Sequence, residues 1–306
     1  MAHINPSEEK QITLYDMKRL VFAALLMLSL EAFAQDFGQD RTITIWDNSS
    51  APHSNGVTAQ EKNENDVITL VTQTQLYIYE ADKEKATGQS ILVIPGGGYH
   101  CVCIEYEGYK MAKWLSSQGI TCGVLKYRLP NGHREVPLED AIEAMRTMRK
   151  MSKELNIDPA KVGIMGFSAG GHLAASASNF APIDERPDFA ILFYPVITGD
   201  PATGHRPSLD HLLGHTATDY DRAMYSLDTR VTKNTPPTLL LLSDYDVVVP
   251  PAGSALYYAA LKKHGIEAAM RIYPGGFHGW SMHLDFPYLE DWQGAVMDWL
   301  KKRNND

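Results

Sequence analysis

The chain has 306 residues, of which 44% are hydrophobic and 21% charged, a composition typical of a globular protein with a sizeable core. Its formal net charge is −9 and basic residues are not clustered, which excludes an extended nucleic-acid-binding surface, because phosphate contacts require grouped Lys and Arg. The three cysteines, Cys101, Cys103 and Cys122, are too few for a disulfide framework. One pair could form, but three partly buried free thiols fit better. Nothing in the sequence indicates an oligomeric state.

The N-terminal segment has the pattern of a secretory signal peptide. Lys18 and Arg19 precede the apolar run 20–30, and Ala-Phe-Ala at 32–34 offers a small-residue cleavage site before Gln35. The run is too short to span a bilayer comfortably, and no cysteine follows the cleavage site. A secretory signal is therefore favoured over a membrane span or a lipid anchor.

Acidic residues within 1–16 fit poorly upstream of such a signal, so we interpret this stretch as an over-extended start before a signal that begins at Met17. The alternative is an N-terminal helix of the fold. We expect residues 1–34 to be removed. Residues 35–306 then form one domain, secreted or periplasmic, with no stable membrane insertion after processing.

The following residues alternate between strand and helix patterns. Two early segments, 42–48 and 74–81, alternate apolar and polar residues and predict half-exposed antiparallel strands at a sheet edge. Further strands are predicted at 91–98, 121–129, 162–165, 189–196, 237–244 and 268–275, and helices at 108–119, 137–155, 252–263 and 289–302. This order predicts an α/β fold with a doubly wound, mostly parallel sheet covered on both faces. Residues 198–233 break the rhythm and predict a small cap insertion with one short helix.

Ser168 lies between glycines in Gly-Phe-Ser-Ala-Gly, residues 166–170, where a short apolar strand meets an alanine-rich helix. Glycines there allow a sharp turn and close packing of the helix on the strand. The serine would then stand at a helix N-terminus, where backbone N–H groups face a developing anion. In this context the motif is typical of a nucleophile elbow. The alternative is a small residue at a tight turn.

Partners for a nucleophilic serine follow two later strands. Asp244 and Asp246 come after the next-to-last strand, and His278 comes after the last one. The C-terminal ends of parallel strands meet at one edge of a sheet, and the order Ser, Asp, His is the one expected for this arrangement. Taken singly, His278 could pack on Trp280 and an aspartate could simply form a turn. Together they predict a catalytic triad.

Backbone donors for an oxyanion are also predicted. Pro-Gly-Gly-Gly, residues 95–98, ends a strand upstream of the elbow. The amides of Gly97 and Gly98, with the amide of Ala169 after the serine, could bind a tetrahedral oxyanion. Without the other motifs, a plain glycine-rich turn would be the better interpretation.

With these motifs the chain resembles the α/β-hydrolase superfamily, in the esterase/lipase branch with an HGGG-type oxyanion loop. Within that branch it is similar to bacterial acetyl-xylan and feruloyl esterase-like carbohydrate esterases. The matching segments are VIPGGGYH, VLKYRLPNGH, PLEDAIEAMR, KVGIMGFSAGGHLAAS, LFYPVI, NTPPTLLLLSDYDVVVPPAGS and YPGGFHGW. The resemblance implies Ser168 as nucleophile, His278 as base, Asp246 as acid with Asp244 as the fallback, and Gly97, Gly98 and Ala169 as the oxyanion hole. One departure is Pro95, where many relatives have His.

The resemblance implies a serine carboxylic-ester hydrolase that removes acetyl or other small acyl groups from an acylated carbohydrate such as xylan, through an acyl-enzyme and with no metal or organic cofactor. Export fits a polymeric substrate. Three alternatives stay open: a feruloyl esterase, a serine peptidase of the prolyl-oligopeptidase type, and a non-catalytic carbohydrate-binding homologue.

Aromatic and histidine side chains near these motifs are ambiguous. Tyr99, His100 and Trp280 are predicted to narrow the acyl pocket or to stack on a feruloyl ring or sugar, with ordinary packing as the alternative. His211 and His215 have the i, i+4 spacing of a zinc pair but no third ligand is evident, so a role in the cap is favoured. His172 is expected to pack beneath the elbow.

Overall fold

The computed structural model describes residues 36–305, so the predicted signal segment at 17–34 lies outside the described residues. Eight strands form one sheet in the order β1-β4-β7-β5-β8-β9-β10-β11. Their bounds are Arg41–Asp47 (β1), Gln73–Tyr79 (β4), Ser90–Ile94 (β5), Thr121–Lys126 (β7), Val162–Phe167 (β8), Ala190–Phe193 (β9), Thr238–Ser243 (β10) and Ala268–Tyr273 (β11). From β7 to β11 neighbouring strands run parallel, while β1 and β4 are antiparallel additions, as predicted.

One detail of the edge prediction is wrong. The segment containing β4 was expected to be half exposed, but six of its seven residues are buried. The reason is position: β4 lies inside the sheet, between β1 and β7, and its side chains are buried on both faces. Most predicted strands also extend beyond the observed ends by a few residues, because their apolar runs continue into buried loops.

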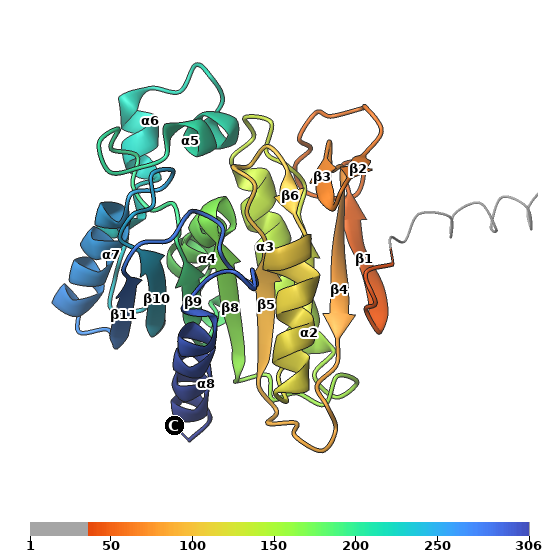
Figure 1. Ribbon diagram of the computed structural model, residues 1–306. Coiled ribbons are helices and arrows are strands. Elements are labelled where there is room, and N and C mark those ends of the chain that lie inside the picture. The colour runs from red at the N-terminus through yellow and green to blue at the C-terminus, as the bar shows by residue number, and fades with distance from the viewer. Residues whose placement is uncertain (1–35, 306) are drawn as a thin grey trace, which may run out of the picture. The chain divides into compact units, whose positions relative to one another are not determined.

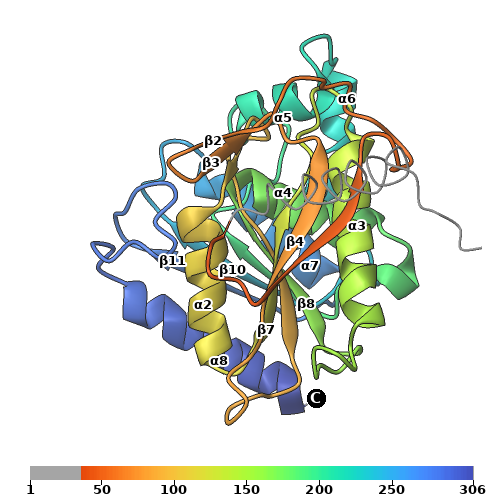
Figure 2. The ribbon, with the colours of Figure 1, turned by 90° about the vertical axis from the view of Figure 1, so that its right-hand side faces the viewer.

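The helices cover both faces of the sheet. The helices that the sequence predicted have the observed bounds Lys110–Ser117 (α2), Glu135–Lys150 (α3), Ser168–Phe180 (α4), Pro251–Lys263 (α7) and Leu289–Asn305 (α8). Figure 2 looks along the layers and shows α2 and α8 on one side of the sheet and α3 on the other. Helix α4 packs against α3, and the right-handed crossovers of parallel strands place α7 on that same side.

The C-terminal ends of the parallel strands carry the irregular structure, at the top of Figure 1. The insertion at 198–233 contains two α-helices, Arg206–Leu213 (α5) and Asp219–Met224 (α6), and a 3₁₀ turn, Leu227–Thr229 (η3), where one helix was expected. A three-stranded sheet, Lys62–Glu64 (β2), Val67–Thr69 (β3) and Val102–Cys103 (β6), was not predicted. A π-helical turn, Glu105–Tyr109 (η1), follows β6. A further 3₁₀ turn, Ile183–Glu185 (η2), follows α4.

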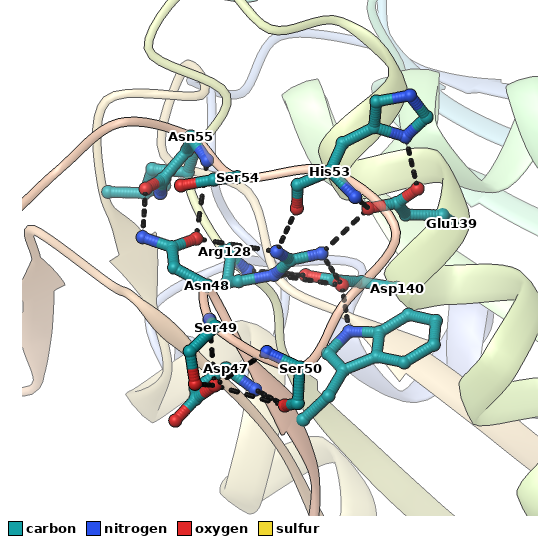
Figure 3. A network of polar contacts seen from close by, with 12 residues as sticks. Asp47, Asn48, Ser49, Ser50, His53, Ser54, Asn55, Arg128, Glu139 and Asp140 are labelled. Atoms are coloured by element: carbon teal, nitrogen blue, oxygen red, sulfur yellow. Dashed lines mark hydrogen bonds and ion pairs between the residues drawn. The ribbon is translucent and has the colours of Figure 1, made fainter.

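A buried polar network ties the antiparallel edge to the rest of the domain (Figure 3). The Arg128 guanidinium is fully buried and donates to both carboxylate oxygens of Asp140 in α3. Trp46 of β1 donates to the same carboxylate, and Arg128 also donates to the His53 carbonyl. The loop after β7, the loop after β1 and helix α3 are therefore held by one buried ion pair.

Candidate active site

The strand–turn–helix around Ser168 has the geometry predicted for it. Ser168 follows β8 directly, begins α4 and has a backbone φ of +52°. The flanking glycines are required by space: a Cβ on Gly166 would lie 2.3 Å from the Gly170 carbonyl oxygen. A Cβ on Gly170 would lie 2.3 Å from the carbonyl oxygen of Ile94. The serine side chain is thus presented on a sharp turn that the neighbouring backbone encloses.

The structure brings the three predicted side chains together in one hydrogen-bonded series. Ser168 Oγ lies 2.8 Å from His278 Nε2, and His278 Nδ1 lies 2.6 Å from Asp246 Oδ2. The Asp246 side chain is almost fully buried, and its other oxygen accepts the amide protons of Val248 and Val249. Because Nδ1 faces a carboxylate, it carries the ring proton, which leaves Nε2 free to accept the serine proton.

The second aspartate has a different environment. Asp244 is exposed, and its Oδ1 accepts the amide proton of Gly275 at 2.6 Å. It therefore supports the loop that carries His278, while Asp246 contacts the imidazole itself.

The glycine turn after β5 is held through its carbonyl groups. The Gly97 carbonyl accepts the amides of His100 and Cys101, and the Gly98 carbonyl accepts Nδ1–H of His211 from the cap helix α5. Within residues 36–305, no protein acceptor is found for the N–H groups of Gly97 and Gly98. Ala169 lies in the first turn of α4, where backbone N–H groups have no intrahelical partner. These are the three predicted oxyanion donors.

A cavity of about 360 Å³ opens at Ser168. Its reactive end is formed by Gly97, Gly98, Ser168 and His278. Its walls come from β3, β6, η1, the cap and the loops after β10 and β11, and include Val67, Cys103, Tyr106, Glu107, His205, Val248 and His283. Tyr106 and His283 stack with ring centroids 3.7 Å apart, and Lys110 lies over the Tyr106 ring. The cavity therefore has apolar and polar walls around Ser168.

None of the three predicted substrate-contacting side chains lines the cavity at Ser168, and the burial of Tyr99 and Trp280 corrects the prediction for those two. Trp280 is fully buried and stacks on Phe286 at 4.3 Å between ring centroids. Tyr99 is buried beneath the glycine turn, where its hydroxyl bonds His172. His100 is exposed and faces His211 in a neighbouring cavity. A residue that is close to a motif in the sequence can point in any direction in the fold. Tyr99 and Trp280 have the ordinary packing role that was the alternative in the sequence analysis.

His172 packs beneath the elbow, as expected. Its Nε2 lies 3.0 Å from the Tyr225 carbonyl, so that nitrogen carries the proton and Nδ1 accepts from the Tyr99 hydroxyl. Burial lowers the pKa of His172 to about 4. The neutral ring therefore links the cap to the glycine turn at ordinary pH.

The zinc-like histidine spacing does not form a helical pair, because α5 ends at Leu213 and Gly214 leaves the helix with φ +86° before His215. In the described part of the chain, no group of three His, Cys, Asp or Glu side chains could hold a metal ion. The cysteines are free thiols, with Cys101 and Cys103 Sγ atoms 3.9 Å apart.

Most wall residues escaped the sequence analysis, and those with polar or aromatic side chains include Tyr106, Glu107, His205 and His283. Glu107 carried the clearest available signal, since it is an acidic residue close behind the glycine turn. It is 7% exposed, and burial raises the pKa of its carboxyl group. Tyr106 shares the turn η1 with Glu107, and His205 and His283 lie in loops, so the sequence pattern does not indicate where these side chains point.

Comparison with known proteins agrees with this geometry. A family model described as the alpha/beta hydrolase fold matches residues 91–282, a range that contains all the residues of the serine, aspartate, histidine and glycine-turn motifs. A crystal structure of an acetyl ester-xyloside bifunctional hydrolase from Caldicellulosiruptor lactoaceticus is 33% identical, with a TM-score of 0.71, over 86% of this chain and 96% of that one.

Two curated relatives match part of their own length. An acetylxylan esterase of Xylanibacter ruminicola is 38% identical over 71% of this chain and 46% of that protein. An endo-1,4-beta-xylanase B of Butyrivibrio fibrisolvens is 37% identical over 72% of this chain and 36% of that protein. The chain thus spans less than half the length of these relatives.

Proposed function

This chain belongs to the alpha/beta hydrolase fold family, and from that membership we propose that it is a serine esterase that removes acetyl groups from xylan or xylan-derived oligosaccharides. The observation that carries the proposal is the hydrogen-bonded series from Ser168 through His278 to Asp246, which ends in an open cavity. The substrate class rests on the names of the relatives, which include an acetylxylan esterase and an acetyl ester-xyloside hydrolase.

In the proposed reaction His278 accepts the Ser168 proton while the serine oxygen attacks the ester carbonyl. The negative charge that develops on the carbonyl oxygen is stabilised by the amides of Gly97, Gly98 and Ala169. His278 then protonates the departing sugar hydroxyl, which leaves an acetyl-serine. Water then attacks the carbonyl of the acetyl-serine and gives a proton to the same histidine. Acetate leaves as His278 returns the proton to the Ser168 oxygen. Asp246 keeps the imidazole in the required tautomer and stabilises it while it is charged.

The first test is product analysis by mass spectrometry. Acetylated xylo-oligosaccharides and feruloylated arabino-oligosaccharides are incubated side by side with the protein and with its Ser168→Ala variant. Acetate release that the variant lacks is the expected result. Ferulate release instead of acetate release would show that the acyl group is feruloyl and not acetyl. Release of neither, together with labelling of Ser168 by a fluorophosphonate, would reject the polysaccharide substrate and direct attention to small esters and peptides. Failure of the fluorophosphonate to label Ser168 would favour the non-catalytic alternative.

We further propose that the protein is exported, since residues 17–34 have the signal pattern and a polymeric substrate lies outside the cell. Among the described residues, no helix is both long and apolar enough to cross a membrane. N-terminal sequencing of the protein recovered outside the cytoplasm is expected to begin at Gln35. A protein retained in the cytoplasm with its N-terminus intact would contradict export.

A further inference from the structure

The carboxyl group of Glu107 is buried beside the reactive serine, and the mechanism above does not use it. Among the described residues, no Lys or Arg lies within ion-pair distance of Glu107. A buried carboxylate without a cation costs several kcal/mol of desolvation on the order-of-magnitude scale for buried ions. The hydrogen bonds that Glu107 accepts offset this cost, and they indicate which segments the carboxyl group holds.

One oxygen of Glu107 holds the glycine turn. Oε2 accepts the amide proton of Gly96 at 2.8 Å, while the Gly96 carbonyl accepts the amide proton of Cys103. Both sides of the residue that leads into the turn are therefore fixed. The contact is close, since a Cβ on Gly96 would lie 2.9 Å from Glu107 Oε2 and 2.9 Å from the Cβ of Ser168. Gly96 is thus enclosed between the carboxylate and the serine.

The other oxygen reaches the side of the site that carries the histidine. Oε1 accepts the hydroxyl proton of Tyr194, a buried residue in the loop after β9. The Tyr194 ring packs edge-on against the His278 ring, with centroids 4.9 Å apart. One carboxylate therefore joins the segment that supplies the oxyanion amides to the ring that supports the proposed base.

We propose that Glu107 is a positioning residue, which holds the Gly96–Gly98 turn in register with Ser168 and His278 so that the turn amides meet the transition-state oxyanion. The inference rests on the proposed serine-esterase function but not on the identity of the acylated sugar. Its effect falls on the transition state, because the charged oxygen that the amides bind exists only there.

The test uses 4-nitrophenyl acetate as a generic acetyl ester, with active sites counted by a fluorophosphonate so that only folded, reactive enzyme is compared. Glu107→Leu removes both acceptors. We expect kcat to fall about 10²-fold, the scale of one lost oxyanion donor, with KM changed less than about twofold. Glu107→Gln keeps an acceptor for the Gly96 amide and is expected to retain kcat to within about tenfold. Tyr194→Phe, which breaks only the second contact, should fall between the two.

A transition-state analogue separates positioning from general damage. A trifluoromethyl ketone forms a tetrahedral adduct with an anionic oxygen, which resembles the transition state. Its inhibition constant should therefore increase across the three variants in proportion to the loss of kcat/KM. The matched control is Asp140→Asn, a change at a buried carboxylate that does not line the cavity. It should lower the urea midpoint of unfolding and leave kcat per titrated site unchanged.

Either of two kinetic results would overturn the role of Glu107: wild-type kcat per titrated site in the Leu variant, or a kcat in the Gln variant that is no higher than in the Leu variant. An analogue affinity that stays constant while kcat falls would do the same. These outcomes differ from failure of the proposed function, in which the wild-type protein itself would show no turnover that depends on Ser168.

Discussion

The histidine beneath the elbow gives a prediction whose size follows from the structure. His172 is fully buried, donates through Nε2 to the Tyr225 carbonyl and accepts through Nδ1 from Tyr99. Burial lowers its pKa from 6.5 to about 4, because the interior disfavours the charged ring. The folded protein therefore resists protonation of this side chain, whereas the unfolded chain accepts the proton at ordinary acidity.

The sign follows from proton linkage. Below pH 6.5 the unfolded state binds a proton at His172 that the folded state does not bind. The free energy of unfolding therefore decreases as the pH is lowered, until the folded ring also titrates near pH 4. At about 1.4 kcal/mol for each pH unit between the two values, the whole window corresponds to about 3 kcal/mol. Between about pH 7.5 and about pH 5, the loss assigned to His172 is about 2 kcal/mol.

The assay is urea unfolding of the wild type and of His172→Gln at both pH values. The Gln amide can still donate to the Tyr225 carbonyl but does not titrate, so the wild type should lose about 2 kcal/mol more than the variant on acidification. Comparing the pH dependence of each protein with itself cancels the cost of the substitution. His264→Gln, at an exposed histidine after α7, is the control and should follow the wild type. Equal pH dependence of wild type and His172→Gln would refute the assignment of a buried, neutral ring.

Three further predictions, two of them with a comparison variant, test the site and its support. Asp246→Asn should lower kcat about 10⁴-fold with little loss of stability, while Asp244→Asn should cost less than about tenfold; the reverse order in steady-state kinetics would reassign the acid. Arg128→Met should reduce the free energy of unfolding by about 3–5 kcal/mol in urea titration, because it leaves buried carboxylate without its cation, and a loss below about 1 kcal/mol would contradict this. Gly97→Ala should abolish esterase activity, because Gly97 has φ of +125° and an added Cβ would lie 2.2 Å from the Cys101 carbonyl oxygen. The comparison variant is Gly265→Ala, at a residue with φ of +74° and no atom near the added Cβ. It should change the free energy of unfolding by about 1 kcal/mol and leave kcat intact.

The sequence predicted the elements whose signal is long and continuous. Buried parallel strands are runs of apolar residues, and residues placed just after them must meet at one edge of the sheet. That rule brought Ser168, His278 and the pair Asp244 and Asp246 to one edge, because they follow three different strands of the same sheet. The choice of Asp246 over Asp244 came from the family resemblance. The glycine turn was predictable for the same reason.

Short segments and side-chain directions were beyond that rule. Strands β2, β3 and β6 are two or three residues long, too short for any periodicity to register. In the cap, the second helix did carry a sequence signal that was overlooked, since Thr218 and Asp221 form a capping box. The burial of Trp280 depends on Phe286 and Trp292, which come from later segments that only the fold places beside it.

Backbone conformation identifies the same site by a separate route. Left-handed φ values at Asn and Asp are tolerated in turns, but at a bulky side chain they cost about 1 kcal/mol or more and persist only where surrounding contacts enforce them. Tyr99, Ser168 and Tyr194 have φ of +59°, +52° and +35°. Each is held by a contact: the Tyr99 hydroxyl by His172, the Ser168 carbonyl by the Val196 amide, and the Tyr194 hydroxyl by Glu107. These three strained residues belong to the glycine turn, the nucleophile and the support of His278. Outside this group, Leu70 has φ of +57° in the turn before β4 and Ser281 has φ of +20° after the His278 loop. Three of the five left-handed residues that are neither Gly, Asn nor Asp therefore belong to the proposed site, and removal of the contacts that hold them should lower kcat before it lowers stability.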